Sequence, residues 1–466
     1  MLFRKRNDAQ FRKFALSGNM YHVLLQVGTP LAFYNSLAIF YRMLDTLMAS
    51  HINAETVSAV AYLTQINIAV SSVGAGLAVG AGLKISKAYG AGDYPEVTRL
   101  VSTLYALCTF LNLFVLLLIP GAPVFLRLSG MPEDLIRVGT TYFRVELAGM
   151  ILTFFNNAYI AIERSRGNSG RIFLLNTLVT IIKLSLTAFF VYILNSGVTM
   201  IAVASVISQA VLFVAGLFYM SGKNSSFRFS PASISLKKET LAPLFTLSFP
   251  VIIERVTFAV GKVIVNSMCG VYGSLTVGAL GICNNLTGIY ANAESGYEEG
   301  GSAIIAQNMG AKKEARALEA LRDTFIINLV FGTVGLILSM LTINWFSTVY
   351  ATSSQGINLE FRDLIKSIFY TDALGTIIPW GIGASVTAFL YGIGKTKQIL
   401  FINFCRLFIF RIGFLALLQR FTSLGSESVG IVMMLSNTLT AVLAVIMLIP
   451  ELRSFRAKYG LEKVRA

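Results

Sequence analysis

The chain has 466 residues, of which 55% are hydrophobic and only 13% are charged, and its mean hydropathy is +0.69. A water-soluble globular protein cannot bury so much apolar surface, so the composition predicts a protein that has lipid as its solvent. The formal net charge of +15 is concentrated in the termini and in alternate loops between apolar runs, which indicates orientation in a membrane rather than nucleic-acid binding.

The apolar runs are long enough to cross a bilayer, which takes about 20 helical residues. They are continuous and do not alternate with polar residues, which favours a bundle of helices over a β-barrel. We therefore predict an all-α polytopic membrane protein with twelve transmembrane helices. The expected spans are 21–48, 57–83, 97–119, 135–162, 172–194, 198–220, 241–268, 275–303, 317–341, 364–391, 398–418 and 429–449.

The basic N-terminal segment, MLFRKRNDAQFRKF, leads into an apolar run too long for a signal-peptide core, so we expect a retained tail. Lys and Arg are frequent in both termini and in the loops after even-numbered spans. The opposite loops hold only Arg127, Arg137, Arg362, Lys366 and Arg420. The positive-inside rule then predicts a multi-pass protein of the plasma (inner) membrane with both termini in the cytoplasm.

The sequence also contains an internal repeat. A single offset, that from Gly90 to Gly310, carries "YGAG" at 89–92 onto "MGAK" at 309–312 and superposes further glycines and a proline without a gap. A second pair of segments aligns at a slightly larger offset, that from Gly167 to Gly394. The further pairs at the first offset are Pro30 with Pro250, Gly76 with Gly296, and Gly80 with Gly300.

Because the first offset carries span 1 onto span 7, each half holds six spans and the halves enter the membrane in the same sense, as in parallel-repeat transporters. We predict an N-terminal lobe at 1–220, a cytoplasmic linker at 221–239, and a C-terminal lobe with a basic tail at 240–466. The two Gly-Ala loops are typical of a helix end followed by a new helix start. With the prolines, they predict hinges at Pro30, Pro250, Gly90 and Gly310.

At this point the sequence resembles the multidrug and toxic compound extrusion (MATE) family of secondary transporters. The resemblance is carried by "LDTLMA" at 44–49, the "GAGDY" and "MGAKK" loops, the glycines before spans 5 and 11, and the repeat of six spans. It covers nearly the whole chain. It implies export of organic, often cationic, compounds against inward movement of Na⁺ or H⁺.

An ionisable group within the hydrocarbon is costly and therefore a candidate for function. In the resemblance, Asp45 matches the acid of an N-lobe cation site, together with Asn176, Thr180 and Ser205. Thr180 stands where some relatives have a second acid, which weakens a Na⁺ site in this lobe. The alternative is that Asp45 only pairs with Arg42, one helical turn away.

The second lobe offers Glu254, four residues after Pro250, and Asp372 in span 10. By resemblance these match the acids of the Na⁺-coupled branch, and their hard oxygen atoms suit a small cation such as Na⁺. Protonation is the competing use, because desolvation favours the neutral acid. A structural ion pair, with Arg255 next to Glu254, is the third alternative.

Span 8 carries three acids where the aligned positions of span 2 are uncharged. Glu294 and Glu298, four residues apart, share a helix face and predict a binding site for a cationic substrate, to which Tyr290 and Tyr297 could add cation–π contacts. The alternative is that Glu298 and Glu299 pair with nearby Lys or Arg.

The sequence thus predicts a cation-coupled antiporter that works by alternating access. It has no HExxH or GxSxG motif, so we do not expect an enzyme, and we expect no cofactor other than the coupling ion. The expected partners are a small-molecule substrate, the coupling cation and the bilayer, but no nucleic acid, and the protein is expected to be a monomer. The runner-up is a lipid or lipid-linked oligosaccharide flippase. Six basic residues within the spans leave this alternative open: Arg42, Lys183, Arg255, Lys262, Arg406 and Arg411.

Overall fold

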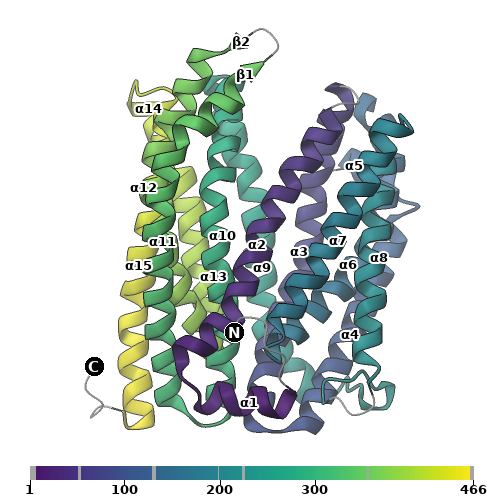
Figure 1. Ribbon diagram of the computed structural model, residues 1–466, viewed down its shortest axis with the longest axis vertical. Helices are drawn as coiled ribbons and strands as arrows, with labels where there is room; N and C mark the ends of the chain where they lie inside the picture. Colours follow the sequence, from purple (N-terminus) through teal and green to yellow (C-terminus); the bar gives the residue numbers. More distant parts are fainter. Residues whose placement is uncertain are drawn as a thin grey trace. The chain divides into compact units, whose positions relative to one another are not determined.

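The structure is a computed structural model that describes residues 7–50, 54–128, 133–197, 199–222, 226–353 and 356–461, with some side chains left out, those of 40–50 and 54–62 among them. Almost all of this chain is helical (Figure 1). The first half contains α1 (Asp8–Ser17), α2 (Met20–Ser50), α3 (Ala54–Ala91), α4 (Tyr94–Leu118), α5 (Ala122–Leu128), α6 (Glu133–Ser165), α7 (Ser169–Ala188), η1 (Phe189–Ile193), α8 (Thr199–Met220) and η2 (Pro231–Ser233). The second half contains α9 (Lys238–Cys269), η3 (Gly270–Tyr272), α10 (Ser274–Gly310), α11 (Glu314–Ala351), β1 (Thr352–Ser353), β2 (Gly356–Ile357), α12 (Leu359–Gly392), α13 (Thr396–Phe404), η4 (Cys405–Gly413), α14 (Phe414–Phe421) and α15 (Glu427–Tyr459).

Each of the twelve expected spans lies, to within one residue, inside one of these helices or, for spans 5 and 11, inside a helix continued by a π-helical segment. Several helices are longer than expected, and α11 and α15 extend ten residues beyond the predicted ends at 341 and 449. Ten helical segments of the described chain are long and apolar enough to cross a membrane. The other two expected spans are α2 and α10, and α10 is less apolar because it carries Glu294, Glu298 and Glu299. The sequence predicted a retained N-terminal tail but no helix within it. In the structure, residues 8–17 of this tail form the helix α1.

The described residues form two compact units. Unit 1 contains residues 7–13 and 37–259, and unit 2 contains residues 14–36 and 260–461. In unit 1, α6 packs against α3, α4 and α8, and Phe143, Leu147 and Phe154 contribute to the core. In unit 2, α12 packs against α10, α11 and α15 (Figure 1). The boundaries fall inside α2 and α9, so the first part of α2 belongs to unit 2 and the first part of α9 belongs to unit 1.

The repeat inferred from the sequence is present in the packing of each unit. In unit 1, a Cβ atom added at Gly76 of α3 would lie 2.7 Å from Ile252 Cα of α9. In unit 2, a Cβ atom added at Gly296 of α10 would lie 2.5 Å from Ala32 Cα of α2. These two contacts are equivalent in the repeat. At the first offset, Gly76 aligns with Gly296, and its partner Ile252 aligns with Ala32, the partner of Gly296. The glycines are therefore explained by close contact between helix backbones, which any side chain would prevent.

The ends of equivalent helices also repeat in backbone detail. After α3, Gly92 N donates to Tyr89 O, and after α10, Lys312 N donates to Met309 O, at the first offset of the repeat. Gly92 and Lys312 both have a positive φ, of 80° and 55°. The same left-handed cap recurs at Gly167 (φ 78°) and Gly394 (φ 82°), at the second offset. The two predicted offsets are confirmed by these turns.

Candidate functional site

The residues predicted for an N-lobe cation site all lie in unit 1. Asp45 is in α2, and its side chain is outside the described part of the structure. Asn176 in α7 and Ser205 in α8 are partly buried, and each donates to a carbonyl of its own helix, Ile172 O at 2.8 Å and Ile201 O at 3.2 Å. Thr180 is also partly buried. These bonds use donors of Asn176 and Ser205, so their side-chain oxygen atoms keep lone pairs for a cation.

Glu254 and Asp372 were predicted to form one Na⁺ site. Glu254 is partly buried in α9, in unit 1, whereas Asp372 is in α12, in unit 2. A joint site therefore stays a prediction, and each acid is described in its own surroundings.

Asp372 is a buried acid with hydroxyl partners, and it is 2% exposed. Thr376 Oγ1, one turn later in α12, donates to Asp372 Oδ1 at 2.5 Å. Thr287 Oγ1 of α10 shares its proton between Cys283 O at 2.9 Å and Asp372 Oδ2 at 3.3 Å. No ion pair involves Asp372 among the residues that the structure describes. The carboxylate is thus held by neutral donors and is not locked to a cationic side chain.

Behind these hydroxyls lies a buried arginine. Arg411 Nη2 donates to Asn437 Oδ1 at 3.0 Å and Arg411 Nε donates to Ser436 Oγ at 3.2 Å. Asn437 Nδ2 in turn donates to Thr376 Oγ1 at 2.8 Å, which completes a chain from Asp372 to Arg411. Arg411 is thus linked to Asp372 through Asn437 and Thr376, without direct contact. Such a chain of hydrogen bonds offsets part of the cost of burying the carboxylate.

Glu294 is as deeply buried as Asp372, but its surroundings differ. It is 0% exposed, and neither Oε1 nor Oε2 accepts a hydrogen bond from any residue that the structure describes. Its carboxylate lies against two glycines, since a Cβ atom added at Gly332 of α11 or at Gly381 of α12 would lie 2.5 Å or 2.8 Å from Oε1. Its side chain is therefore enclosed between α11 and α12.

The other residues predicted to bind substrate are engaged in packing. Glu298 Oε1 accepts a hydrogen bond from Thr387 Oγ1 of α12 at 2.6 Å, so Glu294 and Glu298 both face α12, as the spacing predicted. Tyr297 is 4% exposed and its hydroxyl lies 3.0 Å from Thr29 Oγ1. The ring of Tyr290 packs on Gly335 of α11. In the described conformation both tyrosine rings contact glycine backbones, and a role in binding cations stays a prediction.

The predicted hinge residues lie within or at the end of helices. Pro30 and Pro250 are inside α2 and α9, Gly90 is inside α3, and Gly310 is the last residue of α10. Proline in a helix interior removes one backbone hydrogen bond and bends the helix. The chain reverses just after each predicted glycine, at the residues with positive φ described above.

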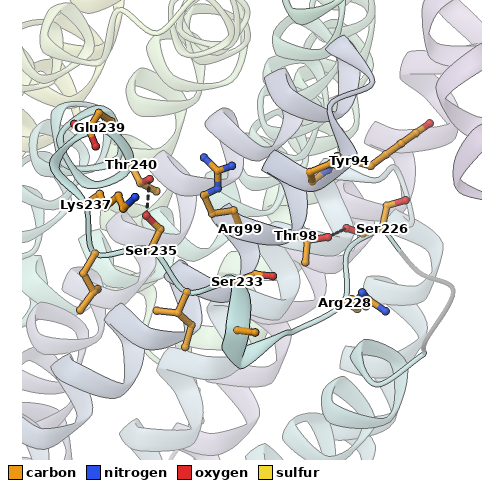
Figure 2. Close-up of a pocket in the computed structure, with 14 residues that line it drawn as sticks. Tyr94, Thr98, Arg99, Ser226, Arg228, Ser233, Ser235, Lys237, Glu239 and Thr240 are labelled. Atoms are coloured by element: carbon orange, nitrogen blue, oxygen red, sulfur yellow. Dashed lines mark hydrogen bonds between the residues drawn. The ribbon is translucent and has the colours of Figure 1, made fainter.

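A large open pocket of about 1190 Å³ lies in unit 1, away from every predicted site residue (Figure 2). It is formed where the segment 226–240 runs across the start of α4. Thr98 Oγ1 donates to Ser226 O at 2.9 Å, and Ser235 Oγ and Thr240 Oγ1 lie 2.9 Å apart (Figure 2). Arg99, on its rim, is 48% exposed and paired with Glu96 at 3.0 Å. These contacts attach the linker to α4. The charged side chains that line the pocket are at the surface of the protein.

Sequence reasoning missed the residues that surround Asp372 and Glu294 in unit 2. Thr287, Thr376 and Asn437 were not singled out, and neither was Asn328 of α11. The available signal was a polar side chain within an apolar run, which is costly in lipid unless it has a partner. That signal marks all four positions but does not say which acid each one serves.

Comparisons with known proteins agree with this architecture. The MatE family model matches residues 30–193 and again residues 250–417, and the two matches start at the aligned prolines of the repeat. The probable multidrug resistance protein YoeA of Bacillus subtilis is 25% identical over 331 residues, which cover 68% of this chain and 70% of that protein. The multidrug export protein MepA of Staphylococcus saprophyticus is 22% identical over 399 residues, which cover 84% of this chain and 85% of that protein.

The fold is also similar to solved structures. One, described as the outward-facing conformation of a multidrug resistance MATE family transporter of the MOP superfamily, matches with a TM-score of 0.90 at 18% identity. The match covers 97% of this chain and 100% of that chain. At this identity the match establishes the fold, and the predicted bundle of twelve transmembrane helices with an internal repeat is confirmed.

Proposed function

The chain belongs to the MatE family of membrane transporters, and on this premise we propose that it is a cation-coupled antiporter that exports organic compounds by alternating access. The names of the relatives from Bacillus and Staphylococcus, which describe multidrug resistance and multidrug export, support this substrate class. The acids within the spans favour cationic or amphiphilic compounds as substrates. The coupling ion is Na⁺ or H⁺.

One observation carries the proposal. Asp372 is buried in an apolar span and is held by Thr287 and Thr376 rather than by a cationic side chain. A carboxylate that is permanently paired with a cationic side chain does not bind a further cation, whereas one held by neutral hydroxyls can exchange a cation or a proton. Occupation of this acid would change the relative stability of two conformations, which is how binding drives alternating access.

The remaining assignments complete the proposal. In unit 1, Asp45, Asn176, Thr180, Ser205 and Glu254 supply oxygen atoms for the coupling ion. The protein acts as a monomer in the plasma membrane with both termini in the cytoplasm, as its basic loops predict. It needs no cofactor and catalyses no covalent reaction.

The names of the relatives favour this function over the flippase alternative. The contacts of two intramembrane arginines with neighbouring side chains favour it as well. Arg411 donates to Ser436 and Asn437, and Arg406 lies 4.8 Å from the centre of the Trp380 ring. Arginines engaged in this way are less available for a pyrophosphate.

The test is transport in vesicles that contain the purified protein. A Na⁺ gradient and a pH gradient are imposed separately, with a fluorescent organic cation or a lipid-linked sugar as cargo. We expect export of the organic cation under at least one gradient, and we expect Asp372→Asn to reduce it about 100-fold, which corresponds to roughly 2.7 kcal/mol.

Glu360→Gln is the matched control, because Glu360 is an exposed acid in the first turn of the same helix, and it should export like the wild type. Undiminished export by the Asp372→Asn protein would refute the role of Asp372. Movement of lipid-linked sugar without movement of the organic cation would refute the proposed substrate class.

A further inference from the structure

The buried carboxylate of Glu294 has no counter-charge among the described residues. Glu294 belongs to α10 and is 0% exposed, and its two oxygen atoms have no hydrogen-bond donor within the described ranges. A charged carboxylate in such surroundings loses its hydration and gains nothing in return. The side chain must therefore be neutralised by something other than these protein groups.

A neighbouring buried side chain carries a third orphaned oxygen atom. Asn328 of α11 is 0% exposed, and its Nδ2 donates to Ser385 Oγ at 3.0 Å and to Gly381 O at 3.4 Å. These two acceptors fix the orientation of the amide. Asn328 Oδ1 is consequently turned away from them and has no partner in the described part of the chain.

Both side chains lie against Gly381. A Cβ atom added there would lie 2.8 Å from Glu294 Oε1 and 3.3 Å from Asn328 Cβ. Gly332, one turn after Asn328 in α11, leaves room for the same carboxylate oxygen. Two helices thus contribute glycines, and one contributes an amide, to a niche whose orphaned atoms are all hydrogen-bond acceptors.

The charged groups along the three helices do not neutralise Glu294. No described residue forms an ion pair with it, and those nearest along the helices have partners of their own or carry the same sign of charge. Glu298 accepts from Thr387, Asp323 is paired with Arg322 at 2.8 Å, and Asp372 accepts from its threonines. These nearest charged groups are Glu298 and Glu299 in α10, Arg322 and Asp323 in α11, and Asp372 in α12.

We propose that Glu294 is a proton-binding site of unit 2, protonated in the described conformation, with Asn328 Oδ1 as the acceptor for its O–H group. A proton turns one of the three acceptor atoms into a donor and so satisfies a second. A hard metal cation would need about six oxygen ligands, which is more than the three orphaned atoms supply. When the niche opens to water, the O–H bond breaks, the proton leaves to water, and the carboxylate remains.

This inference rests on the proposed function in that the proton would be a coupling ion. It assigns Glu294 to ion binding instead of the substrate contact expected from its spacing with Glu298. It also distinguishes Glu294 from Asp372, which has donors of its own.

The test is infrared spectroscopy of the purified full-length protein in lipid nanodiscs at neutral pH without Na⁺. We expect a C=O stretching band of a protonated carboxylic acid that is lost in Glu294→Gln. Glu298→Gln is the matched control, because Glu298 lies one turn further on the same face and has a hydroxyl partner, and it should keep the band. A spectrum of the Glu294→Gln protein identical to that of the wild type would overturn the proposal.

Two further measurements make the result decisive. Glu294→Asp keeps the acid but withdraws it from Gly332, so its band should remain at a shifted frequency, and an unshifted band would contradict the assigned surroundings. Loss of the wild-type band on addition of Na⁺ would overturn the proton in favour of a metal ion. The infrared measurement does not depend on transport. If the wild type shows the band but exports no organic cation in the vesicle assay, the proposed function is refuted and the proton site is not.

Discussion

Asp372 and Glu294 are buried acids of unit 2 that form no ion pair with a described residue, and their surroundings differ. Asp372 is 2% exposed and accepts hydrogen bonds from two threonine hydroxyls, with Arg411 behind them. Glu294 is 0% exposed and lies among glycines, with no donor from the described residues. Burial alone therefore does not determine what an intramembrane acid does, because the donors around it decide whether the charged or the neutral form is stabilised.

The contrast indicates that these two acids of unit 2 have different roles. Asp372 has hydroxyl donors and a more distant guanidinium, which offset part of the cost of its lost hydration. Glu294 can be charged only when its niche is open to water. An acid that changes its charge with conformation links proton binding to that conformation, which is the requirement for coupling.

Removing Arg411 should have the largest effect on the difference between Asp372 and Glu294. In Arg411→Met, Asn437 Oδ1 and Ser436 Oγ lose a buried donor and Asp372 loses its compensating charge. We expect the free energy of unfolding to fall by roughly 3 kcal/mol. Asp372 should then resemble Glu294, and a second protonated-carboxyl band should appear in the infrared spectrum.

Two controls identify the origin of that band. It should be absent from the Asp372→Asn, Arg411→Met double variant, and Arg411→Lys should reproduce less of the effect because it keeps the charge. Thermal unfolding in detergent gives the stability change. A spectrum without a second band would mean that the hydroxyls alone stabilise the charge of Asp372.

A smaller effect is expected from filling the niche of Glu294. In Gly381→Ala the new Cβ atom would lie 2.8 Å from Glu294 Oε1, so the carboxyl group must move, at a cost of about 1–3 kcal/mol. Gly383→Ala is the matched control two residues later in α12, where an added Cβ would meet no other described group within 4 Å. Thermal unfolding of the two variants measures the difference.

A double variant tests whether the carboxylate is the cause. If Gly381→Ala is introduced together with Glu294→Ala, the space is vacated and the cost of the glycine substitution should fall by about 1 kcal/mol. Equal costs in both backgrounds would place the strain elsewhere, for instance on Asn328.

The repeat and the spans were predictable from the sequence because they depend on patterns that the chain carries locally. Gly76 and Gly296 recur because helix backbones touch there, and each unit repeats the contact with a partner that is shifted by the same offset. Gly167 and Gly394 recur because a left-handed cap follows each helix. Such constraints fix residue type and spacing, so sliding the chain over itself detects them.

The environments of the two acids were not predictable in the same way. Asp372 and Glu294 look alike in the sequence, as acids in apolar runs. Their difference depends on Asn437 and Arg411, which lie outside α12, and on Gly332 and Gly381, which matter only because they face Glu294. Contacts between distant segments are not recorded in local periodicity, so pairing Glu294 with Glu298 as a substrate site was the best inference from spacing alone.

The smallest expected effect concerns the amide that accepts the proton of Glu294. Ser385 Oγ holds Asn328 Nδ2 at 3.0 Å, so Ser385→Ala removes one of its two acceptors and should cost about 1 kcal/mol. The amide is then freer to turn its NH₂ group towards Glu294, which would provide the carboxylate with the donor that it lacks. We therefore expect the protonated band of Glu294 to weaken or shift, whereas Thr387→Ala, which removes one donor to Glu298, should leave it unchanged. If the two variants change the band equally, Asn328 does not orient the proton, and the difference between Asp372 and Glu294 must come from the glycines alone.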